Sequence, residues 1–307
     1  MWVTGARGFI GQWMCRHLAG QGRQVAGIGH GSLPPELLAT TGMTEWLNAD
    51  LGPEGLSQLQ HSRGVPDVIY HLAGGSSVGA SLTAPFEDFT RTVAATARLL
   101  EWMRRNAPTT RVVVASSAAV YGDLGEAARE TASARPQSPY GYHKLMMEQL
   151  CAEYAAAFGL RIAIVRLFSV FGEGLRKQLL WDVGNRIRSG EDPVILGGAG
   201  TEMRDWIHVQ DAVRIMELVA TAASPECIVV NGGSGTGTAV RDVVAQFARA
   251  MGSAVRVEFS GSIRAGDPRF LVADASWLRT RQFAIHVPVE HGLRRYAEWL
   301  TSSESRK

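Results

Sequence analysis

The chain has 307 residues, of which 46% are hydrophobic and 20% are charged, and this balance excludes an intrinsically disordered chain. The 31 basic and 29 acidic residues give a net charge of +2, and no Lys/Arg-rich run is present, so nucleic acid is not an expected partner. The longest apolar runs are interrupted by Ser or Arg and are too short to span a membrane, so no membrane partner is expected either.

The cysteines and the start of the chain indicate a cellular compartment. Cys15, Cys151 and Cys227 are odd in number and far apart, which is typical of free thiols in a reducing compartment and gives no zinc-binding spacing. Met1 leads directly into a predicted strand, so a secretory leader is not expected. We therefore expect a cytoplasmic protein without a metal site.

Short β-rich runs alternate with longer helical patterns in the first half of the chain. The predicted strands are Met1–Thr4, Gln24–Ile28, Thr44–Asn48, Asp67–Leu72, Arg111–Ala115 and Arg161–Arg166. The predicted helices of this half are Phe9–Gln21, Phe86–Arg105 and Pro139–Phe158. Alternation of strands and helices is typical of βαβ units, so we expect an α/β fold with a Rossmann-type, doubly wound sheet of six parallel strands.

The second half of the chain is less regular, with short strands and many glycines. Its predicted helices are Lys177–Ser189, Val209–Thr221, Val240–Met251 and Val289–Ser302. No clean linker separates the halves. We expect a dinucleotide-binding domain over residues 1–172 and a smaller C-terminal α/β lobe over residues 173–307 that binds the substrate.

A glycine-rich loop follows the first predicted strand, with the spacing GxxGxxG. Gly5 permits a tight turn, Gly8 lets the backbone approach a pyrophosphate, and Gly11 lets the next helix lie close to the sheet. The N-terminus of that helix offers N–H groups to the anion. The sequence thus predicts a dinucleotide site, formed in this loop by Gly5, Arg7, Gly8, Phe9, Ile10 and Gly11.

The end of the second predicted strand bears on which dinucleotide is bound. No Asp or Glu occurs from Gly5 to Pro35, so the acid that usually holds the adenosine ribose is missing, and Gly29 stands in its place. His30 and Ser32 can donate to a ribose 2′-phosphate, although no arginine stands in this turn. We expect NADP and leave NAD open. The other expected cofactor contacts are Asp50 (to the adenine amino group), Leu51, Leu72, Ala73 and Gly74.

Tyr140 and Lys144 are four residues apart on a predicted helix, so both side chains point to one face. A nearby ammonium stabilises a phenolate, so Lys144 is expected to lower the pKa of Tyr140 towards working pH. Ser117, at the end of the fifth predicted strand, can hydrogen-bond the substrate oxygen whose proton moves. These three residues are the predicted catalytic group.

With these motifs the chain resembles the extended short-chain dehydrogenases/reductases that act on nucleotide sugars, over nearly its whole length. The matching motifs are TGARGFIG at Thr4–Gly11, DVIYHLA at Asp67–Ala73, SSV at Ser76–Val78, SSAAVYG at Ser116–Gly122, SPYGYHK at Ser138–Lys144, RLFSVFG at Arg166–Gly172, RDWIHVQD at Arg204–Asp211, NGGSG at Asn231–Gly235 and RAGDP at Arg264–Pro268. The resemblance implies that Tyr140 is the acid/base, that Lys144 binds the nicotinamide ribose, and that Ser117 holds the sugar hydroxyl.

The resemblance also implies a nucleotide-diphosphate sugar as substrate and a homodimer formed through the helices Phe86–Arg105 and Pro139–Phe158. Arg204 and Arg264 match positions that usually meet the diphosphate, which two arginines can bind bidentately. The other expected substrate contacts are Ser76, Ser77, Ser169 and Gln178. Thr92 and Ser169 stand where family members often carry Asn.

Three reactions of the family remain to be compared. Sugar 4,6-dehydratases place Asp-Glu after the catalytic Ser or Thr, whereas this chain has Ala118-Ala119, so dehydration is disfavoured. The same catalytic group serves an NADPH-dependent 4-keto-6-deoxyhexose reductase and an NAD-dependent UDP-hexose 4-epimerase. The missing acid at Gly29 favours the reductase, with the epimerase as the alternative. A non-catalytic NADP-binding regulator is a minor alternative, because such proteins are expected to lose Tyr or Lys.

Overall fold

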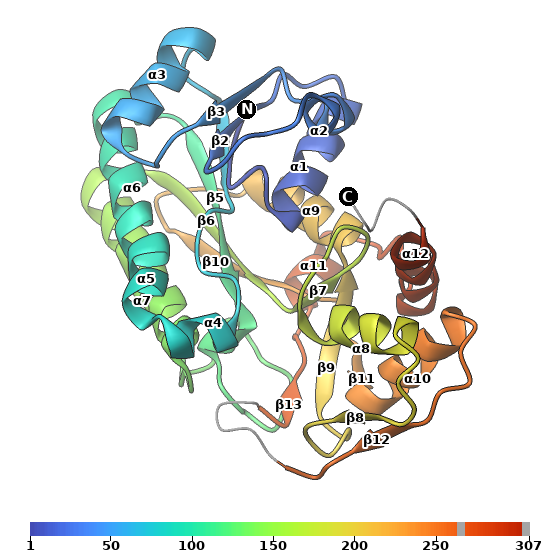
Figure 1. Ribbon diagram of the computed structural model, residues 1–307. Helices are drawn as coiled ribbons and strands as arrows, with labels where there is room; N and C mark the ends of the chain where they lie inside the picture. The colour runs from blue at the N-terminus through green and yellow to red at the C-terminus, as the bar shows by residue number, and fades with distance from the viewer. Residues whose placement is uncertain (263–267, 303–307) are drawn as a thin grey trace. The chain divides into compact units, whose positions relative to one another are not determined.

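The computed structural model describes residues 1–262 and 268–302. The chain divides into two compact units (Figure 1). The first unit consists of Met1–Tyr121, Ser133–Leu167 and Val213–Gly232, and the second of Gly122–Ala132, Phe168–Ala212 and Gly233–Lys307. Each unit is thus made of segments that are not consecutive in the chain.

The first unit is built on a parallel sheet with the strand order β10-β6-β5-β4-β1-β2-β3, seven strands within the described residues. The strands are β1 (Trp2–Thr4), β2 (Ala26–Gly29), β3 (Glu45–Asn48), β4 (Val68–His71), β5 (Arg111–Ser117), β6 (Arg161–Leu167) and β10 (Ile228–Gly232). The Rossmann-type fold is therefore confirmed. The predicted number of strands was wrong by one, because β10 comes from the second half of the chain and pairs with β6.

Helices cover both faces of this sheet (Figure 1). The helical segments that belong to this unit are α1 (Phe9–Gly20), α2 (Pro35–Thr41), α3 (Pro53–Arg63), α4 (Val78–Thr83), α5 (Pro85–Phe89), η1 (Thr90–Ala94), α6 (Ala95–Asn106), η2 (Ala118–Val120), α7 (Pro139–Phe158) and the end of α9 (Val209–Ala220). One core joins side chains from α3, α6 and α7 to the sheet, among them Leu59, Leu99, Met147 and Val112, all fully buried. Because the strands are buried on both faces, they read as apolar runs without alternation.

The helix expected over Phe86–Arg105 is divided. The chain runs as α5, then the π-helical turn η1, then α6. A π-turn adds about one residue to a helical turn and is frequent at functional sites. Here it includes the buried Thr92, whose hydroxyl accepts a hydrogen bond from the Gly75 N–H at 2.9 Å. This hydrogen bond connects the π-helical turn η1 to the loop after β4.

The second unit combines small sheets with four helices, as far as its described residues extend. Its strands are β7 (Ser169–Phe171), β8 (Val194–Leu196), β9 (Met203–His208), β11 (Gly237–Ala239), β12 (Val257–Phe259) and β13 (Phe270–Leu271), and its helices are α8 (Gln178–Arg188), α10 (Val240–Ala250), α11 (Ser276–Thr280) and α12 (Val289–Thr301). β9 pairs with β7, β11 and β13, and β8 pairs with β12. Helices α10 and α12 pack through the stacked rings of Phe247 and Tyr296, whose centroids are 5.5 Å apart.

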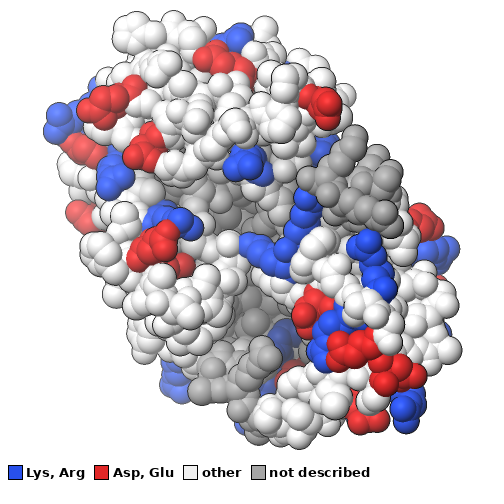
Figure 2. Space-filling view, in the orientation of Figure 1, with Lys and Arg blue, Asp and Glu red and all other residues white. Residues whose placement is uncertain are grey.

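The surface carries charges of both signs. Figure 2 shows Lys/Arg and Asp/Glu side chains on the same face, in keeping with the small net charge. In the described part of the chain, no helix has the length and apolar character needed to cross a membrane.

Candidate active site

The glycine loop joins β1 to α1 and is pressed against the end of β4. Gly5 has φ +67°, and a Cβ on it would lie 2.8 Å from the Ala73 backbone nitrogen. A Cβ on Gly11 would collide with the Gly5 carbonyl oxygen and would lie 2.8 Å from the Ala6 Cα. Only glycine fits these two positions without moving backbone. Such close packing is what the glycine fingerprint of a dinucleotide site requires.

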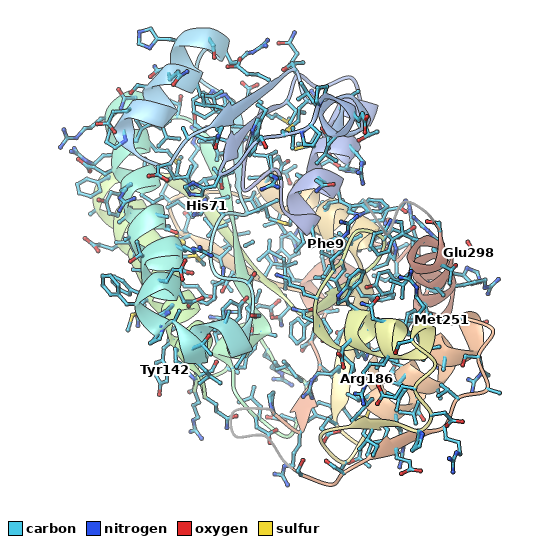
Figure 3. The ribbon with its side chains drawn as sticks, in the orientation of Figure 1. Phe9, His71, Tyr142, Arg186, Met251 and Glu298 are labelled. Atoms are coloured by element: carbon cyan, nitrogen blue, oxygen red, sulfur yellow. The ribbon has the colours of Figure 1, made fainter. Side chains whose placement is uncertain are left out.

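The start of α1 provides hydrogen-bond donors for an anion. Gly8 is the N-cap of α1 and has no side chain to bond the first helical N–H groups. Phe9 and Ile10 begin the helix and are half-buried (Phe9 is labelled in Figure 3). Because the first N–H groups of a helix have no partner within it and carry the positive end of its dipole, this cradle fits the pyrophosphate of a dinucleotide.

The loop after β4 is fixed by a buried histidine. The His71 Nδ1 lies 2.7 Å from the Thr4 hydroxyl, and its Nε2 lies 2.9 Å from the Thr96 hydroxyl. The Thr4 hydroxyl also accepts from the backbone N–H groups of Leu72 and Ala73, both at 3.2 Å. Burial lowers the pKa of His71 to about 3, so the imidazole is neutral and its role is structural.

The strand end where an acid was expected is occupied by an aromatic ring. A Cβ on Gly29 would lie 3.1 Å from the Trp46 ring, so a side chain there would require the indole to shift slightly. The Trp46 Nε1 donates to the Gly31 carbonyl at 3.2 Å, and the Gly31 N–H donates to the Asn48 side chain at 2.8 Å. Trp46 and Asn48 thus hold the turn after β2 in place.

Charges of both signs lie at this turn. The His30 Nε2 and the Asp50 Oδ1 are 3.2 Å apart, on exposed side chains. A Cβ on Gly31 would lie 2.5 Å from the Arg7 Nη1, so the guanidinium covers that glycine. Ser32 is exposed beside them. The nearby Leu51, expected as a cofactor contact, is 6% exposed and belongs to the hydrophobic core.

Ser117, Tyr140 and Lys144 come together in the first unit. Ser117 is the last residue of β5 and the N-cap of η2. Its hydroxyl accepts a hydrogen bond from the Ala119 N–H at 3.2 Å. Tyr140 lies in the first turn of α7 and shares a side-chain hydrogen bond with Ser117. The Lys144 Nζ lies 5.7 Å from the centroid of the Tyr140 ring and donates to the Ala115 carbonyl at 3.0 Å. The side chains of Tyr140 and Lys144 thus lie on one face of the helix, as their i, i+4 spacing predicts.

Burial dominates the ionisation of this group. It raises the pKa of Tyr140, against which the Ser117 hydrogen bond acts, and the Asp88 carboxylate raises that pKa further. Burial also lowers the pKa of Lys144 to about 8. The expected lowering of the tyrosine pKa by Lys144 is therefore not found. The ammonium is directed to the Ala115 carbonyl, and burial of the phenol outweighs its charge.

A buried ion pair that was not predicted from the sequence connects the elements that carry this group. The Arg166 Nη2 on β6 is 2.7 Å from the Glu148 Oε2 on α7, and both side chains are less than one-tenth exposed. Glu148 also accepts a hydrogen bond from Ser116, and the Arg166 guanidinium lies 4.7 Å from the centroid of the Tyr121 ring. The pair thus connects β5, β6 and α7, the elements that carry the predicted catalytic residues.

Apart from Ser117, the expected substrate residues of the first unit follow β4. Ser76 is exposed on the loop after β4, which also carries Gly74, expected as a cofactor contact. Ser77 is the N-cap of α4, where its hydroxyl accepts from the Ala80 N–H at 3.2 Å. Ser77 therefore has a structural role that its position after a strand did not reveal.

The second unit carries three of the other expected substrate residues. Ser169 begins β7, and Arg204 lies in β9, where its Nη1 donates to the Met203 carbonyl at 2.9 Å. Gln178 is the first residue of α8 and has φ +68°, a strained value that is common where function fixes the backbone. Arg264 lies outside the described residues.

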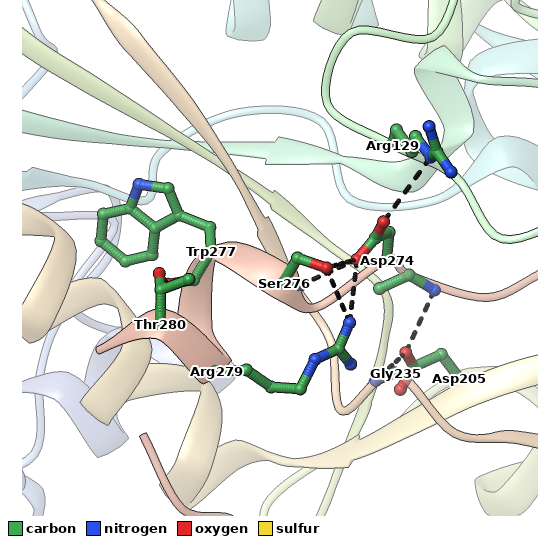
Figure 4. Close-up of polar contacts among 9 residues, drawn as sticks. Arg129, Asp205, Gly235, Asp274, Ser276, Trp277, Arg279 and Thr280 are labelled. Atoms are coloured by element: carbon green, nitrogen blue, oxygen red, sulfur yellow. Dashed lines mark hydrogen bonds and ion pairs between the residues drawn. The ribbon is translucent and has the colours of Figure 1, made fainter. Parts of the chain in front are cut away.

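A buried carboxylate holds two motifs of the second unit together (Figure 4). Asp205 of RDWIHVQD accepts from the N–H groups of Ser234 and Gly235 in NGGSG, both at 2.8 Å, and from the Ala273 N–H at 3.2 Å. These bonds fix the turn after β10. Asp274 organises a second cluster in the same figure, with Ser276, Arg279 and Arg129.

Known proteins match the chain over most of its length. The profile of the NAD dependent epimerase/dehydratase family matches residues 1–232. The chain belongs to this family. It is 32% identical over 294 residues to a protein of Bacillus subtilis named as an uncharacterised UDP-glucose epimerase, with 89% of each chain covered. It is 29% identical to the UDP-glucose 4-epimerase of Streptomyces lividans, over 91% of this chain and 89% of that protein.

Two solved structures are similar over almost the full chain. MoeE5 in complex with UDP-glucuronic acid and NAD has a TM-score of 0.85 and 33% identity, with 97% of both chains covered. The UDP-glucose 4-epimerase of Thermus thermophilus in complex with NAD has a TM-score of 0.88 and 26% identity, over 98% of this chain and 99% of that one. The protein is thus an extended short-chain dehydrogenase/reductase, an NAD(P)-dependent nucleotide-sugar enzyme. The expected preference for NADP and for 4-keto-6-deoxyhexose reduction finds no support among these relatives.

Proposed function

We propose that the chain is an NAD-dependent UDP-sugar 4-epimerase, the alternative left open by the sequence. The observation that carries the proposal is the group of Ser117, Tyr140 and Lys144 in the unit that also holds the glycine cradle. Inversion at carbon 4 needs one group that removes and returns the proton of the 4-hydroxyl. The similarity to UDP-sugar 4-epimerases supports this reaction over reduction.

Each of the three residues has a distinct task in this proposal. Tyr140 takes the proton from the sugar 4-hydroxyl and later returns it. Ser117 hydrogen-bonds the same oxygen, and Lys144 binds the nicotinamide ribose. The glycine cradle would hold NAD, which would supply reversible hydride transfer at carbon 4.

The substrate contacts are proposed from the resemblance. Arg204 and Arg264 bind the diphosphate, because guanidinium groups can each donate two parallel hydrogen bonds to phosphate oxygens. Ser76, Ser169 and Gln178 contact the sugar nucleotide. The printed substrates of the similar proteins make UDP-glucose, UDP-galactose and UDP-glucuronic acid the compounds to test first.

The proposal is tested by incubating the protein with each UDP-sugar and without added reductant. We expect the two carbon-4 epimers of one sugar to interconvert with no net oxidation or reduction. Chromatography of the reaction mixture measures the two epimers. Steady NADPH oxidation with a nucleotide-linked 4-keto-6-deoxyhexose, together with no epimerisation of any UDP-sugar, would establish the reductase instead.

We expect NAD to bind more tightly than NADP. The Asp50 carboxylate stands at the turn after β2, beside His30, and repels a ribose 2′-phosphate. Asp50→Asn should therefore raise the affinity for NADP several-fold while changing that for NAD little, as measured by titration calorimetry. Glu54→Gln, at an exposed acid of α3, is the matched control. Tighter binding of NADP than of NAD by the unaltered protein would contradict this cofactor assignment.

We also propose a homodimer through α5, α6 and α7. Leu82, Phe86, Tyr142 and Met146 are apolar side chains that are 43–80% exposed on α4, α5 and α7, and Tyr142 points outward in Figure 3. A second copy that covers these side chains would remove them from water. Sedimentation should therefore give a dimer that Phe86→Glu with Met146→Glu dissociates, whereas Val65→Glu does not. A monomer at micromolar concentration would refute the dimer.

A further inference from the structure

A buried acid and a histidine lie beside the predicted catalytic group, and the proposed reaction does not use them. Asp88 comes from α5 and His143 from α7, and the His143 Nδ1 is 2.6 Å from the Asp88 Oδ2. The two side chains are 5% and 12% exposed, and the ring of Phe89 packs edge-on against the imidazole. A carboxylate is costly to bury unless a partner compensates it, and His143 is that partner here.

The carboxylate is directed at the loop after β4. The second oxygen, Asp88 Oδ1, occupies the space that a Cβ on Gly75 would need. The Thr92 hydroxyl lies 3.1 Å from the same position and accepts the Gly75 N–H. A Cβ on the preceding Gly74 would lie 3.4 Å from the Lys144 Nζ. Asp88 and Lys144 therefore lie next to two neighbouring glycines of one loop.

Few other charges lie on the elements packed against α5. α4 has no ionisable side chain, and η1 has only Arg91, which pairs with Glu87 at the surface. The ionisable groups of α7 nearest in sequence to His143 are Tyr140, the exposed Tyr142, Lys144 and Glu148, the last of which is engaged by Arg166.

The carboxylate of Asp88 acts on both members of the Tyr140–Lys144 pair. It raises the pKa of Tyr140. It is also the largest single charge effect on Lys144, whose pKa it raises against the opposing effect of burial. Glu148 raises the pKa of Lys144 by a smaller effect. The geometry and the charge thus point to the same carboxylate.

We propose that Asp88, held by His143, is a positioning residue that keeps Lys144 in its charged form beside Tyr140 and so sets the pH range of the reaction. The effect on the reaction rests on the proposed function, whereas the effect on Lys144 does not. A negative neighbour favours an ammonium and disfavours a phenolate. Removal of the carboxylate therefore moves the deprotonation of both Lys144 and Tyr140 to lower pH.

The first test observes Lys144 directly. The chain has three lysines, Lys144, Lys177 and Lys307, so ¹³Cε-lysine labelling gives a short NMR spectrum in which Lys144→Met assigns the signal. The isosteric Asp88→Asn should lower the pH midpoint of the Lys144 signal by about one unit. Glu87→Gln, one residue away at the surface, is the matched control and should leave the midpoint in place.

A second variant covers the case in which Asp88→Asn does not fold. His143→Phe removes the side chain that holds the carboxylate and keeps a ring against Phe89, so Asp88 is no longer fixed toward the loop after β4 and the Lys144 midpoint again falls. An unchanged Lys144 midpoint in a folded Asp88→Asn or His143→Phe protein overturns the proposal.

The second test is the pH profile of kcat/KM with a UDP-sugar. In Asp88→Asn both limbs should move to lower pH, because the reaction needs Tyr140 as phenolate and Lys144 as ammonium, and both deprotonations move to lower pH. A loss of rate without movement of the limbs would mean a merely structural role and would overturn the proposal. If the unaltered protein converts no UDP-sugar, the proposed function fails, while the NMR titration still decides the effect of Asp88.

Discussion

Replacing Tyr140 with phenylalanine should lower kcat by about 10²–10⁴-fold, the usual contribution of a positioned acid/base. The ring and its packing near Lys144 remain, but the oxygen that exchanges a proton with the sugar 4-hydroxyl is gone. NAD binding should change little, because the glycine cradle and Lys144 are retained. Initial rates of epimerisation and calorimetric titration with NAD give the two quantities.

Tyr142→Phe is the control for this change. Tyr142 lies two residues further along α7 with an exposed side chain, and the same hydroxyl is removed from the same helix. We expect its kcat to stay within about two-fold of the unaltered protein, since a surface substitution rarely disturbs a fold. Tyr140 is not the acid/base if both variants keep nearly full activity.

Glu148→Ala should lower the free energy of unfolding by about 3–5 kcal/mol, because it removes the carboxylate that compensates the charge of a buried guanidinium. Arg166 and Glu148 are both less than one-tenth exposed, and their bond spans β6 and α7. Activity at low temperature should fall as well, since α7 carries Tyr140 and Lys144. Urea unfolding followed by tryptophan fluorescence measures the change.

Glu153→Ala serves as the reference for this loss, as it removes an exposed glutamate from the same helix. This substitution should change the free energy of unfolding by no more than about 0.5 kcal/mol, which is typical of surface positions. Equal unfolding curves for the two variants would show that the buried pair adds no stability.

The parts of the fold that depend on local pattern could be predicted from the sequence. Runs such as Arg111–Ala115 indicate buried parallel strands by their unbroken apolar character. β10 was missed because its place beside β6 depends on a chain crossing from the second unit, which no local pattern records. The π-turn at Thr90–Ala94 was missed because one added residue hardly changes a helical period.

In the candidate site, too, contacts set by local spacing could be predicted, whereas contacts between distant segments could not. Tyr140 and Lys144 could be paired because a helix fixes the geometry of residues four apart. The partnership of Asp88 with His143 spans 55 residues and joins two helices, so neither residue carries a recognisable signal by itself. The sign of the pKa shift at Tyr140 also depends on burial, which spacing alone does not give.

The preference for NADP, which the relatives do not support, was drawn from one position only. The absence of an acid at Gly29 was taken to favour a 2′-phosphate, but the Trp46 ring lies close to that position. A carboxylate stands nearby instead, on Asp50 after β3, where it pairs with His30. A residue that is missing from its usual place in the sequence can be replaced in space by one from the next strand.

Transfer of a deuterium label tests the central claim most directly. The protein is incubated with UDP-[4-²H]glucose or UDP-[4-²H]glucuronic acid and without added reductant, and the products are separated and analysed by mass spectrometry. The account predicts the carbon-4 epimer with its deuterium retained, because the hydrogen returns to the carbon that it left. Loss of the deuterium, or formation of product only when NADPH is added, would contradict it.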